Sequence, residues 1–387
     1  MTIPRPATPP LLKRLNEEAV LETIRAGSPI SRAEISRRAG ISKPTVSLAL
    51  QTLLEAGLVR EAPTGPQGPS YGAIYFEPVA EAALVVGIDL GARFLRGAVS
   101  DLSGAVRARQ DVELGGADAD GALTAIAQLR DGLLDAAGLS TGLIDEVVVG
   151  VPGVVESPSG TVRLALNIPG LDGRRFGAEL GERLGHAVTV ENDVNLAALG
   201  EGRRGVARGV ADYIFLSVGT GLGAGLVLRG ELQRGHHGAA GELDYIRAGL
   251  EQELDPCAAA LSRFAERLAR ADGSQTALVP PYDVRSVFAA ARSGDAVADA
   301  VLAEAARRVA AHIAPIAAVT DVGLVVLGGG IGANAELLQG VRPLLAEWLP
   351  YPPRVEMSSL GDAAVLMGAL AVGLRSALGN VFVSRRS

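Results

Sequence analysis

Apolar residues in the segment 43–55 recur at the spacing of a helix with one buried face. They occupy positions i, i+4, i+7 and i+8 of a single stripe, formed by Val46, Leu50, Leu53 and Leu54. Ser42 precedes the stripe as the predicted N-cap, and Pro44 fits the first turn, where its missing N–H costs no helical bond. The pattern therefore predicts a helix that packs on one side and presents its other side to a partner.

Two more helices are predicted upstream of this one. Ser31 and Glu34 have the spacing of a capping box, and Gly40 suits the left-handed residue that ends a helix. Residues 12–24 supply the other helix, whose apolar positions are Val20, Leu21 and Ile24. The sequence thus predicts three consecutive helices with a tight turn before the third.

Two extended segments follow the helices, at 58–61 and 73–76, and the turn-rich residues PTGPQGPSY separate them. Three helices followed by a two-stranded ribbon describe a winged helix-turn-helix over residues 1–78, whose third helix enters the major groove of DNA. Candidate contacts to phosphates are Arg37, Arg38 and Lys43, and candidate contacts to bases are Thr45, Leu48 and Gln51, with Ser42 and Ser47 beside them. The alternative is an ordinary αα-hairpin in a helical domain.

Charge separates the first 60 residues from the rest of the chain. They hold nine Lys or Arg and five Glu, a net charge of +4, whereas the whole chain carries −7. A basic segment on an acidic body favours phosphate attraction confined to one module. A solvated charge run would not explain this division.

Composition narrows the class of protein further. The chain has 387 residues, which is too long for one compact core. The longest uncharged apolar run, 363–374, is too short to span a bilayer, and the N-terminus lacks the apolar core of a signal peptide. Cys257 is the single cysteine, so no intrachain disulfide can form. We expect a cytoplasmic protein with no membrane partner.

After residue 78 the pattern changes to apolar strands with glycine-rich corners. Residues 84–90 and 95–99 form a predicted hairpin, and residues 213–230 repeat the same plan. Each unit precedes a helix-rich stretch and a further strand, at 147–151 and 324–327. This repetition predicts a duplicated, two-lobed α/β body with a cleft between the lobes. The expected lobes are 79–196, joined by a C-terminal helix at 363–378, and 197–387.

Two glycine-rich corners in the body are candidate phosphate sites, because bare backbone N–H groups can approach an anion closely. The candidates are Gly219, Thr220, Gly221 and Gly223 in the first corner and Gly329 and Gly330 in the second. Tight turns explain single glycines equally well.

Amides and carboxylates cluster where the strand at 187–190 ends, in the sequence Glu191-Asn192-Asp193-Val194-Asn195. Further polar loops contain Asn167 and Glu242. Such groups suit a sugar, whose hydroxyls each donate and accept hydrogen bonds. The alternative for Asp193 is that it only caps the following helix.

These motifs together resemble the ROK family (repressors, open reading frames, kinases), and in particular its DNA-binding transcriptional regulators. The likeness covers nearly the whole chain, through GIDLGARFLRGAVSDLSG, LNIPGLDG, ENDVNLAALGEGRRG, VGTGLGAGLVLRGEL, GAAGEL and VVLGGGIGANAEL in order. It implies an actin-like, sugar kinase-like body fused to a winged-helix head. The positions that the resemblance assigns to sugar binding are Asn167, Asn192, Asp193, Glu242, Tyr245 and Glu251. In the kinases of the family, the residue matching Asp193 is the general base.

The chain departs from the family pattern at two phosphate- and metal-related positions. Arg93 stands where the kinases have the threonine of Asp-x-Gly-Gly-Thr. The zinc segment is missing: Tyr245 replaces its histidine and its cysteine loop is deleted. A structural zinc site needs four nitrogen or sulfur ligands, so we expect no zinc, and the retention of ATP binding stays open. The ribbon also lacks Lys or Arg after Arg60, which argues against minor-groove contacts there.

The resemblance and the residues together imply a repressor of carbohydrate-metabolism genes. We expect a homodimer or homotetramer on palindromic operator DNA, released or retained by a sugar in the cleft. An ATP-dependent sugar kinase using Asp193 is the enzymatic alternative. A regulator that has lost sugar binding and responds to a protein partner is the third hypothesis.

Overall fold

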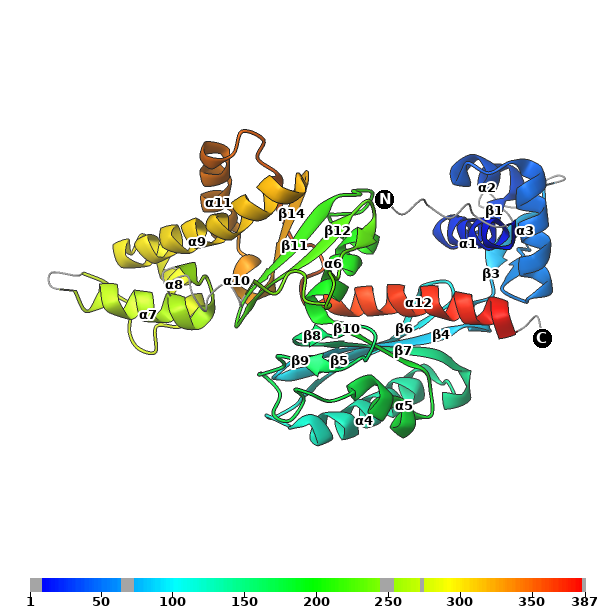
Figure 1. The fold of residues 1–387 in the computed structure, drawn as a ribbon, viewed down its shortest axis with the longest axis horizontal. Helices are drawn as coiled ribbons and strands as arrows, with labels where there is room; N and C mark the ends of the chain where they lie inside the picture. Colours follow the sequence, from blue (N-terminus) through cyan, green and yellow to red (C-terminus); the bar gives the residue numbers. More distant parts are fainter. Residues whose placement is uncertain (1–8, 64–72, 244–253, 272–274, 385–387) are drawn as a thin grey trace.

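The computed structural model describes residues 9–63, 73–243, 254–271 and 275–384. Its N-terminal domain, hereafter the head, lies at one end of the molecule (Figure 1). The head contains α1 (Pro9–Gly27), α2 (Arg32–Ala39), α3 (Lys43–Glu55) and a sheet in the order β1 (Ile30–Ser31), β3 (Tyr75–Pro78), β2 (Val59–Glu61). The predicted winged helix-turn-helix is confirmed, with one more short strand than the sequence indicated.

The helix boundaries of the head follow their caps. Gly40 ends α2 with a φ of 68°, and the Ser42 hydroxyl accepts from the Thr45 N–H at 3.4 Å. The capping box forms only by half: the Ser31 hydroxyl accepts from the Glu34 N–H, whereas the Glu34 carboxylate binds two arginines of its own helix. Two cations attract this carboxylate more strongly than one backbone N–H does.

The buried stripe of α3 differs from the prediction at one position. Val46, Leu50 and Leu53 are buried, but Leu54 is 37% exposed and Ala49 takes its place in the core. The buried face of α3 is therefore rotated slightly, toward Ala49, relative to the predicted stripe.

Two five-stranded sheets form the body, and they share one topology. The strand order of the first sheet is β10 (Val188–Asn192), β7 (Ile144–Val151), β4 (Leu84–Leu90), β5 (Phe94–Asp101), β6 (Val106–Glu113). The strand order of the second sheet is β15 (Arg354–Met357), β14 (Leu324–Gly328), β11 (Tyr213–Val218), β12 (Leu222–Leu228), β13 (Glu231–Leu232). In each sheet a hairpin and its third strand are antiparallel, and the two strands on the other side are parallel. The predicted duplication is confirmed. A separate small hairpin joins β8 (Val154–Val155) to β9 (Val162–Arg163).

Helices cover both sheets. In the first lobe, α4 (Ala119–Ala137) and α5 (Phe176–Leu184) lie on one face, and α12 (Ala364–Ser384) lies on the other with α6 (Asp193–Arg204) (Figure 1). The second lobe carries α7 (Ala258–Ala269), α8 (Val284–Arg292), α9 (Ala296–Thr320), α10 (Gly329–Gly332) and α11 (Ala335–Trp348). The boundary expected between residues 196 and 197 falls inside α6, which packs against both lobes. In the described ranges, no helix combines the length and apolar content that crossing a membrane requires.

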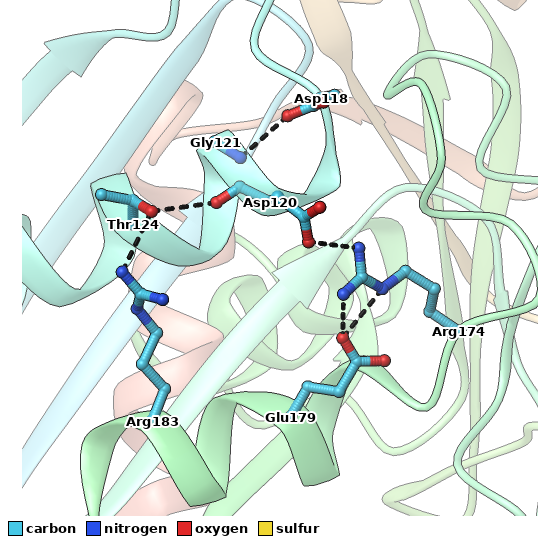
Figure 2. A network of polar contacts seen from close by, with 7 residues as sticks. All are labelled: Asp118, Asp120, Gly121, Thr124, Arg174, Glu179 and Arg183. Carbon is cyan, nitrogen blue, oxygen red and sulfur yellow. Dashed lines mark hydrogen bonds and ion pairs between the residues drawn. The ribbon is translucent and has the colours of Figure 1, made fainter.

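A polar network fastens the outer helices of the first lobe to each other (Figure 2). The Arg174 guanidinium binds Asp120 of α4 at 2.7 Å and also Glu179 of α5. Arg183 of α5 donates to the Thr124 hydroxyl of α4 at 3.0 Å. This layer is on the face away from α12, so it supports the sheet without touching the cleft.

The crossing of α6 and α12 depends on two glycines. A Cβ at Gly368 would lie 1.8 Å from the Leu196 carbonyl oxygen, and a Cβ at Gly200 would lie 2.2 Å from the Ala364 carbonyl oxygen. Neither contact is possible for a real side chain, so the two backbones touch only because glycine stands at both positions.

We predict that Gly368→Ala lowers the free energy of unfolding by about 1–3 kcal/mol, because α12 must shift away from α6. Urea unfolding followed by circular dichroism measures this change. The control is Gly142→Ala, since a Cβ there meets nothing within 4 Å. Equal stability of the two variants would contradict the argument.

Candidate functional site

A cavity of about 250 Å³ lies between the two sheets of the body. It is lined from the first lobe by Asp89 and Arg96 and from the start of α6 by Asp193. The second lobe and the segment before α12 contribute Ser217, Gly329, Gly330, Ser358 and Asp362. The cleft expected from the duplicated sequence therefore exists, and polar groups from both lobes face it.

Asn192 sets the geometry at the start of α6. Its side-chain oxygen accepts from the Asn195 N–H at 2.9 Å, which makes it the N-cap. Its amide nitrogen donates to the Gly153 carbonyl oxygen at 2.9 Å and to Glu242 Oε1 at 3.3 Å. The capping role considered for Asp193 is thus wrong, because Asn192 performs it and leaves Asp193 as the first helical residue.

A loop of the second lobe, residues 233–243, brings Glu242 to this point. Gly241 is held against β12 by a bond from the Ala224 N–H to its carbonyl oxygen at 2.8 Å. A Cβ at Gly241 would lie 1.7 Å from the Ala224 carbonyl oxygen, and its φ is 90°, so only glycine fits. Arg234 in the same loop pairs with the buried Glu191 at 2.6 Å. The loop therefore joins the second lobe to the sugar-site candidates of the first.

The Asp193 carboxylate has an unusual electrostatic position. Burial raises its pKa to about 7, and the nearby carboxylates of Asp89 and Glu242 add to the effect. Its Oδ1 accepts from the Val194 N–H at 2.8 Å, a local contact that any short polar residue at this position can make. Keeping an ionised carboxylate in this environment lowers the stability of the folded protein. Carboxylates with a strongly raised pKa are typical of binding and catalytic sites.

We predict that Asp193→Asn stabilises the protein at pH 8 but not at pH 4. The folded state retains a proton on Asp193 up to about pH 7, whereas the unfolded chain releases it near the ordinary value of 3.8. The stability contributed by this group is therefore full below pH 4 and is lost as pH rises through 7. Thermal unfolding of wild type and variant between pH 4 and pH 8 tests the sign of this stability difference. Each kcal/mol of difference in unfolding free energy is expected to shift the melting temperature by about 2–4 °C. A melting-temperature difference that is independent of pH would contradict it.

Arg96, which the sequence analysis did not single out, occupies the cleft beside Asp89. The two residues face each other across the β4–β5 hairpin, and Arg96 Nη1 lies 3.2 Å from Asp89 Oδ2. Arg96 also lies 3.7 Å from Asp362 near the start of α12. Burial raises the pKa of Asp89 to about 6, and Arg96 opposes that rise. The hairpin register was the signal that could have identified this pair.

Arg93, in contrast, points away from the cleft. Its side chain is 77% exposed and lies 3.4 Å from Glu113. The sequence analysis placed a cation in the first phosphate corner through Arg93, and the structure places it there through Arg96 instead. The side chain three residues later is on the strand face that lines the cavity.

The glycine corners divide between two neighbouring cavities. Gly329 and Gly330 line the cleft with Asp193, whereas Gly219 and Thr220 line a second cavity of about 330 Å³ that also contacts Gly330. Gly223 lies in β12, where a Cβ would be 3.1 Å from Val194 of α6. Gly223 therefore packs against α6, and its place among the phosphate candidates stays a prediction. Gly221 closes the turn by accepting from the Gly219 N–H.

On the head, the outer face of α3 carries the predicted DNA contacts. Lys43, Leu48 and Gln51 are exposed, and Leu48 is 54% exposed although it is apolar. Ser42, Thr45 and Ser47 lie on the same part of the helix, where the Ser47 hydroxyl donates to the Lys43 carbonyl oxygen. The structure therefore leaves the predicted base-reading side chains Leu48 and Gln51 accessible to a partner.

The two arginines at the end of α2 already have a partner. Arg37 and Arg38 both bind Glu34, whose pKa they hold at about 2. A DNA phosphate would therefore share these guanidinium groups with a carboxylate, whereas Lys43 has no such competitor among the described residues. We expect Lys43 to make the stronger phosphate contact.

Comparison with known proteins agrees with this geometry. The model of the ROK family matches residues 85–375. The chain belongs to the ROK family. A MarR family model, which describes a winged helix, matches residues 18–68 in the head.

Relatives of two kinds share this family. The xylose repressor of Caldicellulosiruptor bescii is 27% identical over 94% of this chain and 96% of its own length. A ROK hexokinase from Thermus thermophilus is 30% identical and has a TM-score of 0.63 over 76% of this chain and 99% of its own. A ROK family transcriptional regulator described as a homologue of the E. coli MLC protein has a TM-score of 0.80 at 23% identity, covering 97% of this chain and 98% of its own. The structural similarity to this regulator extends over both the head and the body.

The remaining site predictions from the ROK resemblance have different outcomes. Asn167 lies exposed in the loop after β9. Tyr245 and Glu251 lie outside the described residues. A tetrahedral structural zinc site needs four nitrogen or sulfur ligands. The single cysteine of this chain, Cys257, is buried in the core of the second lobe, so the residues present do not fit the zinc site of the family. The absence of zinc stays a prediction.

Proposed function

We propose that this ROK protein is a transcriptional repressor whose affinity for operator DNA changes when a sugar binds in the cleft. The observation that carries the proposal is one chain that joins a head with an exposed α3 face to a body whose cleft is lined by Asp193, with Asn192 and Glu242 hydrogen-bonded to each other beside it. These carboxylates and the Asn192 amide suit sugar hydroxyls, which both donate and accept. A protein of this kind acts on the chromosome, and we therefore place it in the cytoplasm.

The sugar would act by changing the relative position of the two lobes. Glu242 belongs to the second lobe and Asn192 to the first, so a ligand that contacts both residues favours one separation of the lobes. The ligand shifts DNA affinity only by the difference between its affinities for the two arrangements. Xylose is the first sugar to test, because a xylose repressor is similar to this chain over 94% of its length.

We further propose that the protein binds a palindromic operator as a homodimer or homotetramer. A single winged helix-turn-helix covers one half-site, and two-fold symmetry pairs two of them at a spacing of about one helical turn. Neither zinc nor ATP is required in this proposal, since the head and the sugar-binding residues are independent of both.

Selection of bound fragments from a random duplex library, with and without xylose and other aldoses, tests this function. We expect enrichment of an inverted repeat and a sugar-dependent change in its affinity. Absence of enrichment at low ionic strength would overturn the proposal. Enrichment that no sugar alters would instead support a regulator controlled by a protein partner.

A sugar kinase is the second candidate, and the pKa of Asp193 favours it. A group with a pKa of about 7 is suited to accept a proton from a hydroxyl at neutral pH. Two departures from the kinase pattern oppose it: Arg93 stands where the kinases have a threonine, and the zinc segment is missing. A coupled ADP-release assay with aldoses and amino sugars decides: turnover that Asp193→Ala abolishes would establish the kinase.

A further inference from the structure

A further polar cavity, of about 220 Å³, lies where the head meets the body. Hereafter it is the junction cavity. The last turn of α1 contributes Arg25, the turn after β5 contributes Ser103 and Gly104, and α12 contributes an apolar wall that includes Leu370. The end of α6 and the residues after it contribute three further arginines, Arg203, Arg204 and Arg208. Head and body thus share the lining.

The charges around this cavity are strongly unbalanced. Arg25 and Arg203 both pair with Glu22 of α1, and Arg204 donates to the Gly104 carbonyl oxygen. Among the residues that the structure describes, Glu22 is the one carboxylate within salt-bridge distance of the four arginines. Four guanidinium groups around one carboxylate leave a net charge of +3, with Arg25 buried and the other three arginines exposed at the rim.

Arg25 is the most constrained of the four. Its side chain is 6% exposed, and its Nε is buried with no hydrogen-bond partner in the described protein. Burial and the nearby Arg203 and Arg204 lower its pKa, although Glu22 opposes them. Arg25 lines the cavity beside Arg203 and Arg204, and this concentration of guanidinium donors suits an anionic ligand.

We propose that the junction cavity binds the phosphate group of a small phosphate monoester. A phosphate has several acceptor oxygens and a charge near −2, and arginine forks match its geometry in pairs. The apolar wall of α12 suits the carbon part of such a molecule. The site is distinct from the cleft at the other end of α6 and does not depend on sugar binding there.

The position of α1 favours a small ligand over the DNA backbone. Val20, Leu21 and Ile24 of α1 are buried in the head core with α3, whereas Arg25 lines the junction cavity and Glu22 pairs with Arg203 of the body. The helix therefore stands between the junction cavity and the DNA-reading face.

Occupation of this cavity has a structural consequence. The ligand touches α1 of the head and α6 of the body at once, so it holds the head in one orientation. Because α6 begins at Asp193 and ends at Arg204, the same helix contacts both binding sites. A phosphate monoester would thus be coupled to operator binding, with each ligand changing the affinity for the other.

Equilibrium dialysis of the full chain with radiolabelled inorganic phosphate and with glycerol 3-phosphate, at constant ionic strength, tests the proposal. We expect saturable binding of one phosphate per chain, weakened at least about 10-fold by Arg25→Gln and by Arg208→Gln, because each removes charge-assisted bonds. Arg208 is exposed, so its variant keeps the test valid if Arg25→Gln does not fold. The control is Arg14→Gln, which removes the same charge from α1 away from the cavity and should bind phosphate normally.

Three results would overturn the proposal. The first is no saturable binding of either probe up to about 10 mM, far weaker than useful affinities. The second is binding that neither cavity variant alters. The third is loss of affinity for random duplex DNA and a smaller salt slope in Arg208→Gln, without phosphate binding to the wild type, which would make the arginines part of the DNA interface.

Discussion

Replacing Leu48 with aspartate is expected to weaken operator binding about 100-fold or more and to leave sugar binding unchanged. Leu48 is 54% exposed at the centre of the outer face of α3, so the substitution removes no core packing. In the major groove it would lose an apolar contact and place a carboxylate among phosphates, and such like-charge contacts cost several kcal/mol. Fluorescence anisotropy with labelled operator measures the loss.

The matched control for this variant is Leu143→Asp. Leu143 is 47% exposed on the body, so the change in chemistry and exposure is nearly the same far from the head. Normal operator binding by Leu48→Asp, or an equal loss in both variants, would exclude α3 as the reading helix.

The second large effect is expected at the cleft. Asp193→Ala should weaken sugar binding about 10- to 100-fold, because a hydrogen bond to a charged group is worth about 1.5–3 kcal/mol. Operator binding without sugar should be unchanged, and release of DNA should need correspondingly more sugar. Calorimetric titration with the sugar identified by selection gives the affinity.

Asp135→Ala is the control for Asp193→Ala. Asp135 is exposed on α4, on the face of the first sheet that lies away from the cleft. Full sugar affinity in Asp193→Ala would mean that the ligand binds elsewhere, and the cleft would lose its assigned role.

These expectations depend on features that the sequence indicated to different degrees. Caps and periodicity predicted the head well, because Ser42 and Gly40 act on their immediate neighbours. The strand at 84–90 was predicted at its observed bounds, since a buried apolar run between turns has few alternatives. The capping-box carboxylate was assigned to the wrong partner because Arg37 and Arg38, both in reach on the next turn, compete for it.

Contacts between segments far apart in the chain were harder to predict from the sequence. The motifs suggested that Asn192 and Glu242 belong to one site, but the 3.3 Å contact between them arises from a loop held on β12. Arg96 was overlooked because its role depends on strand register, which pairs it with Asp89 across the hairpin. Gly223 is a phosphate candidate in the sequence, and only the fold shows that it also packs closely against α6.

The sequence by itself determined the three-helix head, the duplicated α/β plan and the residue types of a sugar site, because caps, periodicity and glycine corners act over a few residues. Only the tertiary structure decided which of those residues meet. It put Asn192 rather than Asp193 at the helix cap, turned Arg96 rather than Arg93 into the cleft, and gathered the arginines of α1 and α6 at the junction cavity. Burial and charge proximity are properties of packed segments, and they exist only after distant parts of the chain have come together.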